Sequence, residues 1–155
     1  MEQVASVLAP WIRRVSGMYI NDLKALPVDA FTECPGGCAR TPQEYTGEVA
    51  GMNFVTSKLV SGEISEFPMG ADRPEPKLPA TVEEGCQMIS ASGEALASAV
   101  ETYAANLGNM TKAPWGEEMT LAALANVAAN HIMYHDGQLT YYQSLKGDSE
   151  MHWFD

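Results

Sequence analysis

The sequence predicts an all-α fold, a four-helix bundle with a long crossover connection between the second and third helices. Four stretches, at about 2–26, 41–61, 81–107 and 120–146, repeat apolar residues at steps of three and four, the period of an amphipathic helix. The segment between the second and third stretches is long and rich in proline, which suits a crossover. No stretch alternates convincingly like a strand, and 155 residues suit a single domain spanning 1–155.

The first helix should begin near residue 2 and end at about Leu26-Pro27. A turn-rich stretch follows, in which Pro35-Gly36-Gly37 separates Cys34 from Cys38. The two thiols lack a second pair for a zinc site, and no helix start lies behind them to acidify a thiolate, so we expect reduced loop cysteines. The apolar stripe of this helix is Val4, Leu8, Trp11, Ile12, Val15, Met18 and Tyr19.

The second helix has a strong start signal at Thr41. Thr41 can cap the helix, Pro42 suits its first position, and Glu44 completes a capping box. Gly62 is a plausible stop. The connection that follows, 63–80, should be exposed and non-helical because it holds four prolines, Pro68, Pro74, Pro76 and Pro79.

Thr81 and Thr120 are the expected caps of the third and fourth helices. Gly108 is the natural terminator of the third helix, and Gly147 ends the fourth. Because shorter loops join the first helix to the second and the third to the fourth, we expect each of these pairs to be antiparallel neighbours. One face of the fourth helix carries Leu124, Val127, His131, His135, Gln138 and Tyr142.

Charge argues against two classes of partner. Nine basic against twenty acidic residues give a formal net charge of −11, which repels phosphate backbones and anionic membrane surfaces. We therefore expect neither nucleic-acid nor membrane binding. The start of the chain lacks the order of a secretory signal, and three cysteines form no disulfide framework, so a cytoplasmic location is expected.

His131 and His135 are the first candidates for chemistry. Residues four positions apart lie on one face of a helix, close enough to bind one ion. The alternative is one histidine satisfied in the core and one at the surface, because this spacing alone is common.

The residues after the pair strengthen the metal interpretation. The run His131-x-x-x-His135 continues as Asp136-Gly137-Gln138-Leu139, then Tyr142 and Gly147, and it resembles the DinB-like (DinB/YfiT-like) superfamily. The Ala39-Arg40-Thr41-Pro42 entry to the second helix is similar as well. The resemblance implies a four-helix bundle that binds a divalent metal through three histidines, one in the second helix and two in the fourth.

The second helix departs from that pattern because it contains no histidine. The matching position is Glu48, with Asn53 and Glu44 as the fallback candidates. Two imidazoles and one carboxylate suit a divalent transition metal such as Zn, Ni, Fe or Mn, and they leave positions open for water or substrate. Alternatively, Glu48 is an exposed acid that the positive end of the helix favours. Gln138 is expected to contact the site as an outer-shell partner.

The resemblance also implies activity. It suggests a metal-dependent enzyme of thiol S-transferase, isomerase or hydrolase type that acts on a small molecule, with a low-molecular-weight thiol as a candidate partner. A carboxylate in place of a histidine makes the site less positive by about one charge, which disfavours a bound thiolate. The alternative is a non-catalytic, stress-related helical module with a degenerate metal site.

The remaining aromatic and sulfur-containing side chains are interpreted mostly as packing residues. Trp11, Trp115, Tyr142 and the nine methionines are expected in the core, and Cys86 should pack in the third helix. The aromatic tail, Met151-His152-Trp153-Phe154-Asp155, should cap the bundle or bury against a second subunit. With the habits of the similar family, this tail suggests a homodimer.

Overall fold

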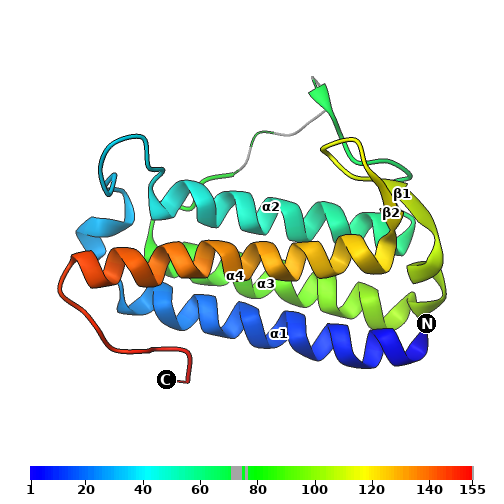
Figure 1. Ribbon diagram of the computed structural model, residues 1–155, viewed down its shortest axis with the longest axis horizontal. Coiled ribbons are helices and arrows are strands. Elements are labelled where there is room, and N and C mark those ends of the chain that lie inside the picture. Colours follow the sequence, from blue (N-terminus) through cyan, green and yellow to red (C-terminus); the bar gives the residue numbers. More distant parts are fainter. Residues whose placement is uncertain (71–74, 76, 155) are drawn as a thin grey trace.

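The computed structural model describes residues 1–70, 75 and 77–154. This part of the chain is mostly helical, as the sequence predicts (Figure 1). The described residues also form the short 3₁₀ helices η1 (Val28–Phe31) and η3 (Ala104–Gly108) and a small antiparallel hairpin. Pro74, Pro76 and Asp155 lie outside the described residues. The long helices are α1 (Glu2–Ala25), α2 (Pro42–Ser61), α3 (Val82–Thr102) and α4 (Leu121–Leu145).

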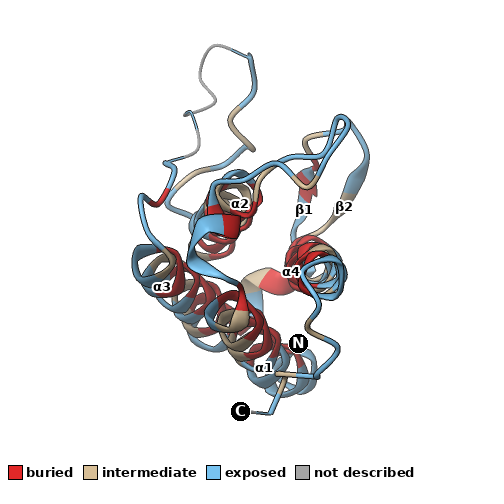
Figure 2. Ribbon diagram, turned by 90° about the vertical axis from the view of Figure 1, so that its left-hand side faces the viewer, coloured by how far each residue is buried: buried red, intermediate tan, exposed pale blue. Residues whose placement is uncertain are grey.

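The four long helices lie side by side, with their buried faces turned toward one another (Figure 2). Helix α1 packs mainly against α3 and α4, and α2 packs against the same two helices. The expectation that α1 neighbours α2 and that α3 neighbours α4 is therefore wrong, because each of these pairs lies on a diagonal. Both connections exceed a dozen residues, which is enough chain to reach the opposite corner. Helices α2 and α3 run in the same direction (Figure 1).

Threonine caps fix where α2, α3 and α4 begin. The Thr41 hydroxyl accepts from the Glu44 amide at 3.2 Å, and the Thr41 amide donates to the Glu44 carboxylate at 2.7 Å. This is the capping box that the sequence predicts. Thr81 and Thr120 accept hydrogen bonds from amides three residues on, at 3.1 and 3.2 Å. These starts set the rotational position of each helix, and hence the face on which Glu48 and the histidines lie.

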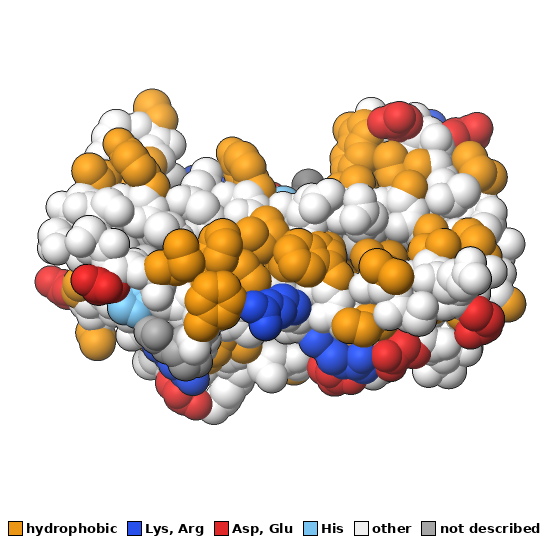
Figure 3. Space-filling view, turned by 60° about the horizontal axis from the view of Figure 1, so that its bottom comes forward, with side chains coloured by type: hydrophobic (Ala, Val, Ile, Leu, Met, Phe, Trp, Pro, Cys, Tyr) orange, Lys and Arg blue, Asp and Glu red, His pale blue; other side chains and the backbone are white. Residues whose placement is uncertain are grey.

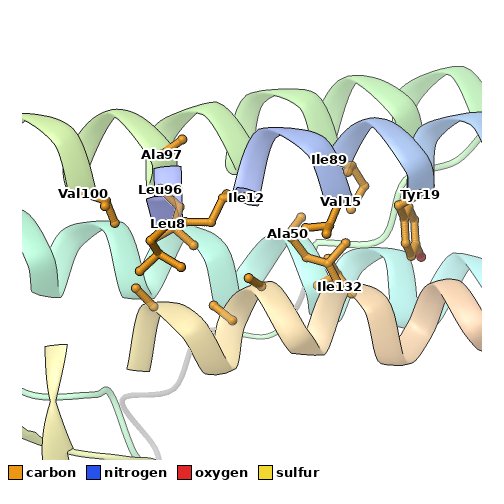
Figure 4. Packing of buried hydrophobic residues seen from close by; sticks show 14 of the residues in the cluster. Leu8, Ile12, Val15, Tyr19, Ala50, Ile89, Leu96, Ala97, Val100 and Ile132 are labelled. Carbon is orange, nitrogen blue, oxygen red and sulfur yellow. The ribbon is translucent and has the colours of Figure 1, made fainter. Parts of the chain in front are cut away.

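The core runs the length of the helices (Figure 4). Small residues let the helices approach closely. A Cβ atom at Gly93 of α3 would lie only 2.3 Å from Ser16 Oγ of α1. One turn further along α1, Tyr19 shares a 2.8 Å hydrogen bond with Thr46 of α2. The labelled core residues in Figure 4 are Leu8, Ile12, Val15, Tyr19, Ala50, Ile89, Leu96, Ala97, Val100 and Ile132.

Two elements differ from the sequence prediction. Helix α3 ends at Thr102 rather than 107, and the chain continues as η3, whose Asn106 donates to the Val60 carbonyl at 2.9 Å. The prediction also contained no strand, whereas β1 (Met110–Lys112) pairs with β2 (Glu118–Thr120). Strands of three residues are too short to show a clear alternation of apolar and polar side chains.

The core prediction fails for the two tryptophans. Trp11 is 40% and Trp115 54% exposed, so both lie at the surface. Several methionines are exposed as well, including Met110 and Met151, whereas Met18 is buried. Helical periodicity places a residue near a core face but does not decide whether a neighbouring element covers it. Tyr142 and Cys86 are buried as expected.

Candidate metal centre

Helices α2 and α4 bring the three candidate ligands together. Glu48 lies in the second turn of α2, and His131 and His135 lie one turn apart near the middle of α4, which packs against α2. The Nε2 atoms of the two histidines are 3.0 Å apart, and His131 Nε2 is 3.4 Å from Glu48 Oε1. One donor atom from each of the three residues falls within 4.8 Å of the other two. The group could therefore hold one metal ion.

The spacing of these donors fits coordination of a transition metal. Donors bound to one ion at about 2.1 Å lie about 3.0 Å apart at a right angle and about 3.4 Å apart at the tetrahedral angle. The two separations that involve His131, 3.0 and 3.4 Å, match these values. Three protein ligands leave further positions for water or substrate, the usual form of a catalytic rather than a structural site.

Burial keeps both imidazoles neutral, which is the form that binds metal. Burial and the neighbouring His131 lower the pKa of His135 to about 4. Burial likewise lowers the pKa of His131, although the Glu48 carboxylate opposes this shift. For Glu48, burial would raise the pKa, but the hydrogen bond and charge of Arg40 outweigh it and lower the pKa. The site thus offers two neutral nitrogens and one ionised carboxylate.

Several neighbours orient the candidate ligands. Gln138 Oε1 lies 2.7 Å from His135 Nδ1, so His135 Nδ1–H donates a hydrogen bond to Gln138, and Nε2 is left to face the ion. Tyr45 of α2 stacks on the His135 ring, with centroids 5.3 Å apart. Tyr134 meets the same ring edge-on at 5.0 Å. The sequence indicated Gln138 as such a partner, and the structure places it in contact with His135.

Arg40 is the neighbour that the sequence did not indicate. Its Nη1 forms an ion pair with Glu48 Oε2, while the other carboxylate oxygen of Glu48 faces His131. Arg40 lies in the loop before Thr41, eight residues from Glu48. Helical spacing predicts contacts between residues three or four positions apart, so it does not predict this pair. The place of Arg40 directly before the capping box of α2 was the only sequence signal available.

The fallback candidates have other roles. The Glu44 carboxylate is used in the capping box of α2. Asn53 is fully buried and donates to Ser92 Oγ of α3 at 3.3 Å, away from α4. Of the three acidic or amide positions considered in α2, Glu48 is the one that meets the histidines.

The other chemically interesting residues lie apart from this centre. Cys34 and Cys38 are exposed free thiols, and burial raises the pKa of the Cys86 thiol. His152 of the tail pairs with Asp148 at 2.9 Å. Trp153 packs partly against the core, whereas the Phe154 ring is exposed beneath the Arg14 guanidinium.

A large groove adjoins the centre. Glu48 and His131 belong to its lining, together with apolar side chains of α2, α4 and the hairpin loop.

Among the described residues, no helix combines the length and apolar character needed to cross a membrane. No protein-family model matches the chain, and no curated protein matches it in sequence.

Proposed function

We propose that this protein binds a divalent transition metal through Glu48, His131 and His135. The observation that carries the proposal is the convergence of the three donors, at separations that suit one ion. Neutral imidazoles and an ionised carboxylate are the protonation states that such a site requires. Zn, Ni, Fe or Mn suits this mixed nitrogen and oxygen donor set.

We further propose that the chain is a DinB-like protein with a four-helix bundle and a crossover between α2 and α3. The parallel direction of these two helices supports the crossover. The histidine pair followed by Asp136-Gly137-Gln138-Leu139 supports the family assignment.

As an enzyme, the protein would act on a small molecule at the open side of the centre. A bound divalent ion there would act as a Lewis acid and lower the pKa of a coordinated water or thiol. Gln138 holds the His135 tautomer, and Arg40 balances the charge of Glu48. The Glu48 carboxylate favours a hydrolase or isomerase over a thiol transferase, because it reduces the positive charge that stabilises a thiolate.

One observation favours the alternative, a non-catalytic module with a degenerate site. Arg40 already pairs with Glu48, and the Nε2 atoms of the two histidines share a hydrogen bond, so these donor atoms have partners without an ion. In that case the contacts among the three residues would stabilise the packing of α2 against α4, and the residues would bind no metal.

Metal content separates these two functions. We expect protein purified without chelator to contain about one metal ion per chain by mass spectrometry, and Glu48→Ala, His131→Ala and His135→Ala to lose it. His152→Ala is the matched control, because His152 pairs with Asp148 outside the centre. Wild-type protein without metal after reconstitution, or loss of metal in His152→Ala as well, would contradict the proposal.

We also propose a homodimer formed through α1. Val7 and Trp11 are 70% and 40% exposed and line a shallow groove between α1 and α4. Figure 3 shows hydrophobic side chains in a band along this face of the molecule. A second copy that covers this band would remove apolar surface from water.

A further inference from the structure

We propose that the groove beside the metal centre binds a small monoanionic molecule with an uncharged apolar body, such as an arylalkyl carboxylate. The anionic head would approach the metal centre, and the body would lie against α2, α4 and the hairpin loop. This inference rests on the proposed metal binding and deepens it, because it names the class of ligand that the centre would meet.

The groove has the size and lining of a small-molecule site. Its volume is about 1220 Å³, and its lining residues come from α2, α3, α4, the connection after α2 and the hairpin loop. Ligand sites are mostly apolar, with a few polar groups that fix orientation. On the α4 side the groove has this composition, since its charged or titratable lining residues there are Glu48 and His131.

The apolar wall next to the centre comes from three elements. Met52 and Val55 lie on α2, four and seven residues (one and two turns) beyond Glu48, and Val127 lies one turn before His131 on α4. Trp115 closes this side from the hairpin loop, where its indole donates to Glu117 at 3.0 Å. Trp115 is 54% exposed, so its ring can still gain contact with a bound apolar group.

The charge of the metal centre determines which end of the ligand should be anionic. A divalent ion with the Glu48 carboxylate and the Arg40 guanidinium leaves a net positive centre, which attracts an anion. Elsewhere the groove lining carries Glu66, Glu75 and Glu84 against Lys58 and Lys77, and the whole chain has a net charge of −11. A second negative group on the ligand would be repelled, so the body should be uncharged.

Chain length of the ligand tests the inference. With zinc-loaded protein, we expect calorimetry to show that 4-phenylbutyrate binds at least about tenfold more tightly than acetate, because its phenylpropyl body is buried in the groove. Removal of the metal with EDTA should abolish this binding. Equal affinity for the two carboxylates, or unchanged binding of 4-phenylbutyrate without metal, would overturn the inference.

Two substitutions locate the binding surface. Trp115→Ala and Val127→Asn should each weaken 4-phenylbutyrate binding about fivefold or more, with acetate affinity and metal content unchanged. Trp11→Ala is the matched control, since Trp11 lies on α1 outside the groove. An equal loss in the control would contradict the assigned surface. Absence of metal from the wild type would overturn both proposals, whereas bound metal without a chain-length preference would overturn only this one.

Discussion

Glu48 lies between a cation and two neutral imidazoles. Arg40 holds one carboxylate oxygen, and the other faces His131 at 3.4 Å. The resemblance to the DinB-like superfamily indicated Glu48 but left Glu44 and Asn53 as alternatives, because a register inferred from one sequence can shift by a residue or two. Only the packing of α2 on α4 shows which of the three meets the histidine pair.

The pH dependence of metal binding follows from the two buried histidines. Each imidazole must be neutral to bind, and the pKa of His135 is lowered to about 4. We therefore expect metal affinity, measured by competition with a chromophoric chelator, to fall only at a pH below the ordinary histidine range. A fall centred on the ordinary histidine pKa of about 6.5 would show that the imidazoles are exposed to water.

Asp136, next to His135, should limit stability at neutral and alkaline pH. Burial and the neighbouring Asp22 carboxylate raise its pKa well above the usual range. The folded state therefore keeps a proton that the unfolded state has lost, so stability falls as pH rises from about 4. Asp136→Asn mimics the protonated carboxyl, so this variant should not lose that stability as the pH rises.

Urea denaturation in the presence of EDTA measures the effect. We expect Asp136→Asn to be more stable than wild type by about 1 kcal/mol or more at pH 8, with a smaller advantage at pH 5. The histidines contribute equally to the pH dependence of stability in both proteins, so their contribution cancels when the two stabilities are subtracted. A stability difference that does not change with pH would contradict a raised Asp136 pKa.

At the scale of the elements, α1 and α3 depend on a close contact at one glycine. A Cβ atom at Gly93 would lie 2.9 Å from Ser16 Cβ and closer still to Ser16 Oγ. The contact is between helices that are distant in sequence, so the glycine alone gave no indication of it. Thr41, Thr81 and Thr120, by contrast, act within their own helices and were identified from the sequence.

Alanine substitutions at two helical glycines should have opposite effects. Gly93→Ala should destabilise the protein by about 1–3 kcal/mol, because α1 and α3 must move apart. Gly17→Ala is the matched control, because nothing lies within 4 Å of the added Cβ, and it should stabilise by about 0.5–1 kcal/mol. Chemical denaturation of both variants gives the comparison. Equal changes in stability for the two variants would mean that helix propensity, rather than the contact with Ser16, determines the effect of the alanine.

At the scale of the whole molecule, the diagonal arrangement of α1 and α2 leaves α1 with an outer face. Helix α1 packs inward on α3 and α4, so Val7 and Trp11 point away from the core. An Arg13 pair with Glu94 and Glu101 lies nearby on the surface, at 2.8 and 2.7 Å. The apolar band thus has a polar border, which is typical of an interface between subunits.

The oligomeric state tests this face. We expect wild-type protein to be a dimer by light scattering at micromolar concentration and Val7→Glu to shift it to monomer, because a charge would be buried in the interface. Val28→Glu is the matched control, since Val28 is 84% exposed and lies in η1 rather than α1. A wild-type monomer, or dissociation by both variants, would contradict the proposed interface.

The sequence by itself determined the helical fold, the capped starts of three helices and the pair His131 and His135, because these depend on local spacing and local hydrogen bonds. Tertiary structure decided which helices are neighbours, where Arg40 meets Glu48, and that Trp115 stands at a groove rather than in the core. These features arise between segments far apart in the chain. Their geometry is set by the packing of whole helices, which no local pattern encodes.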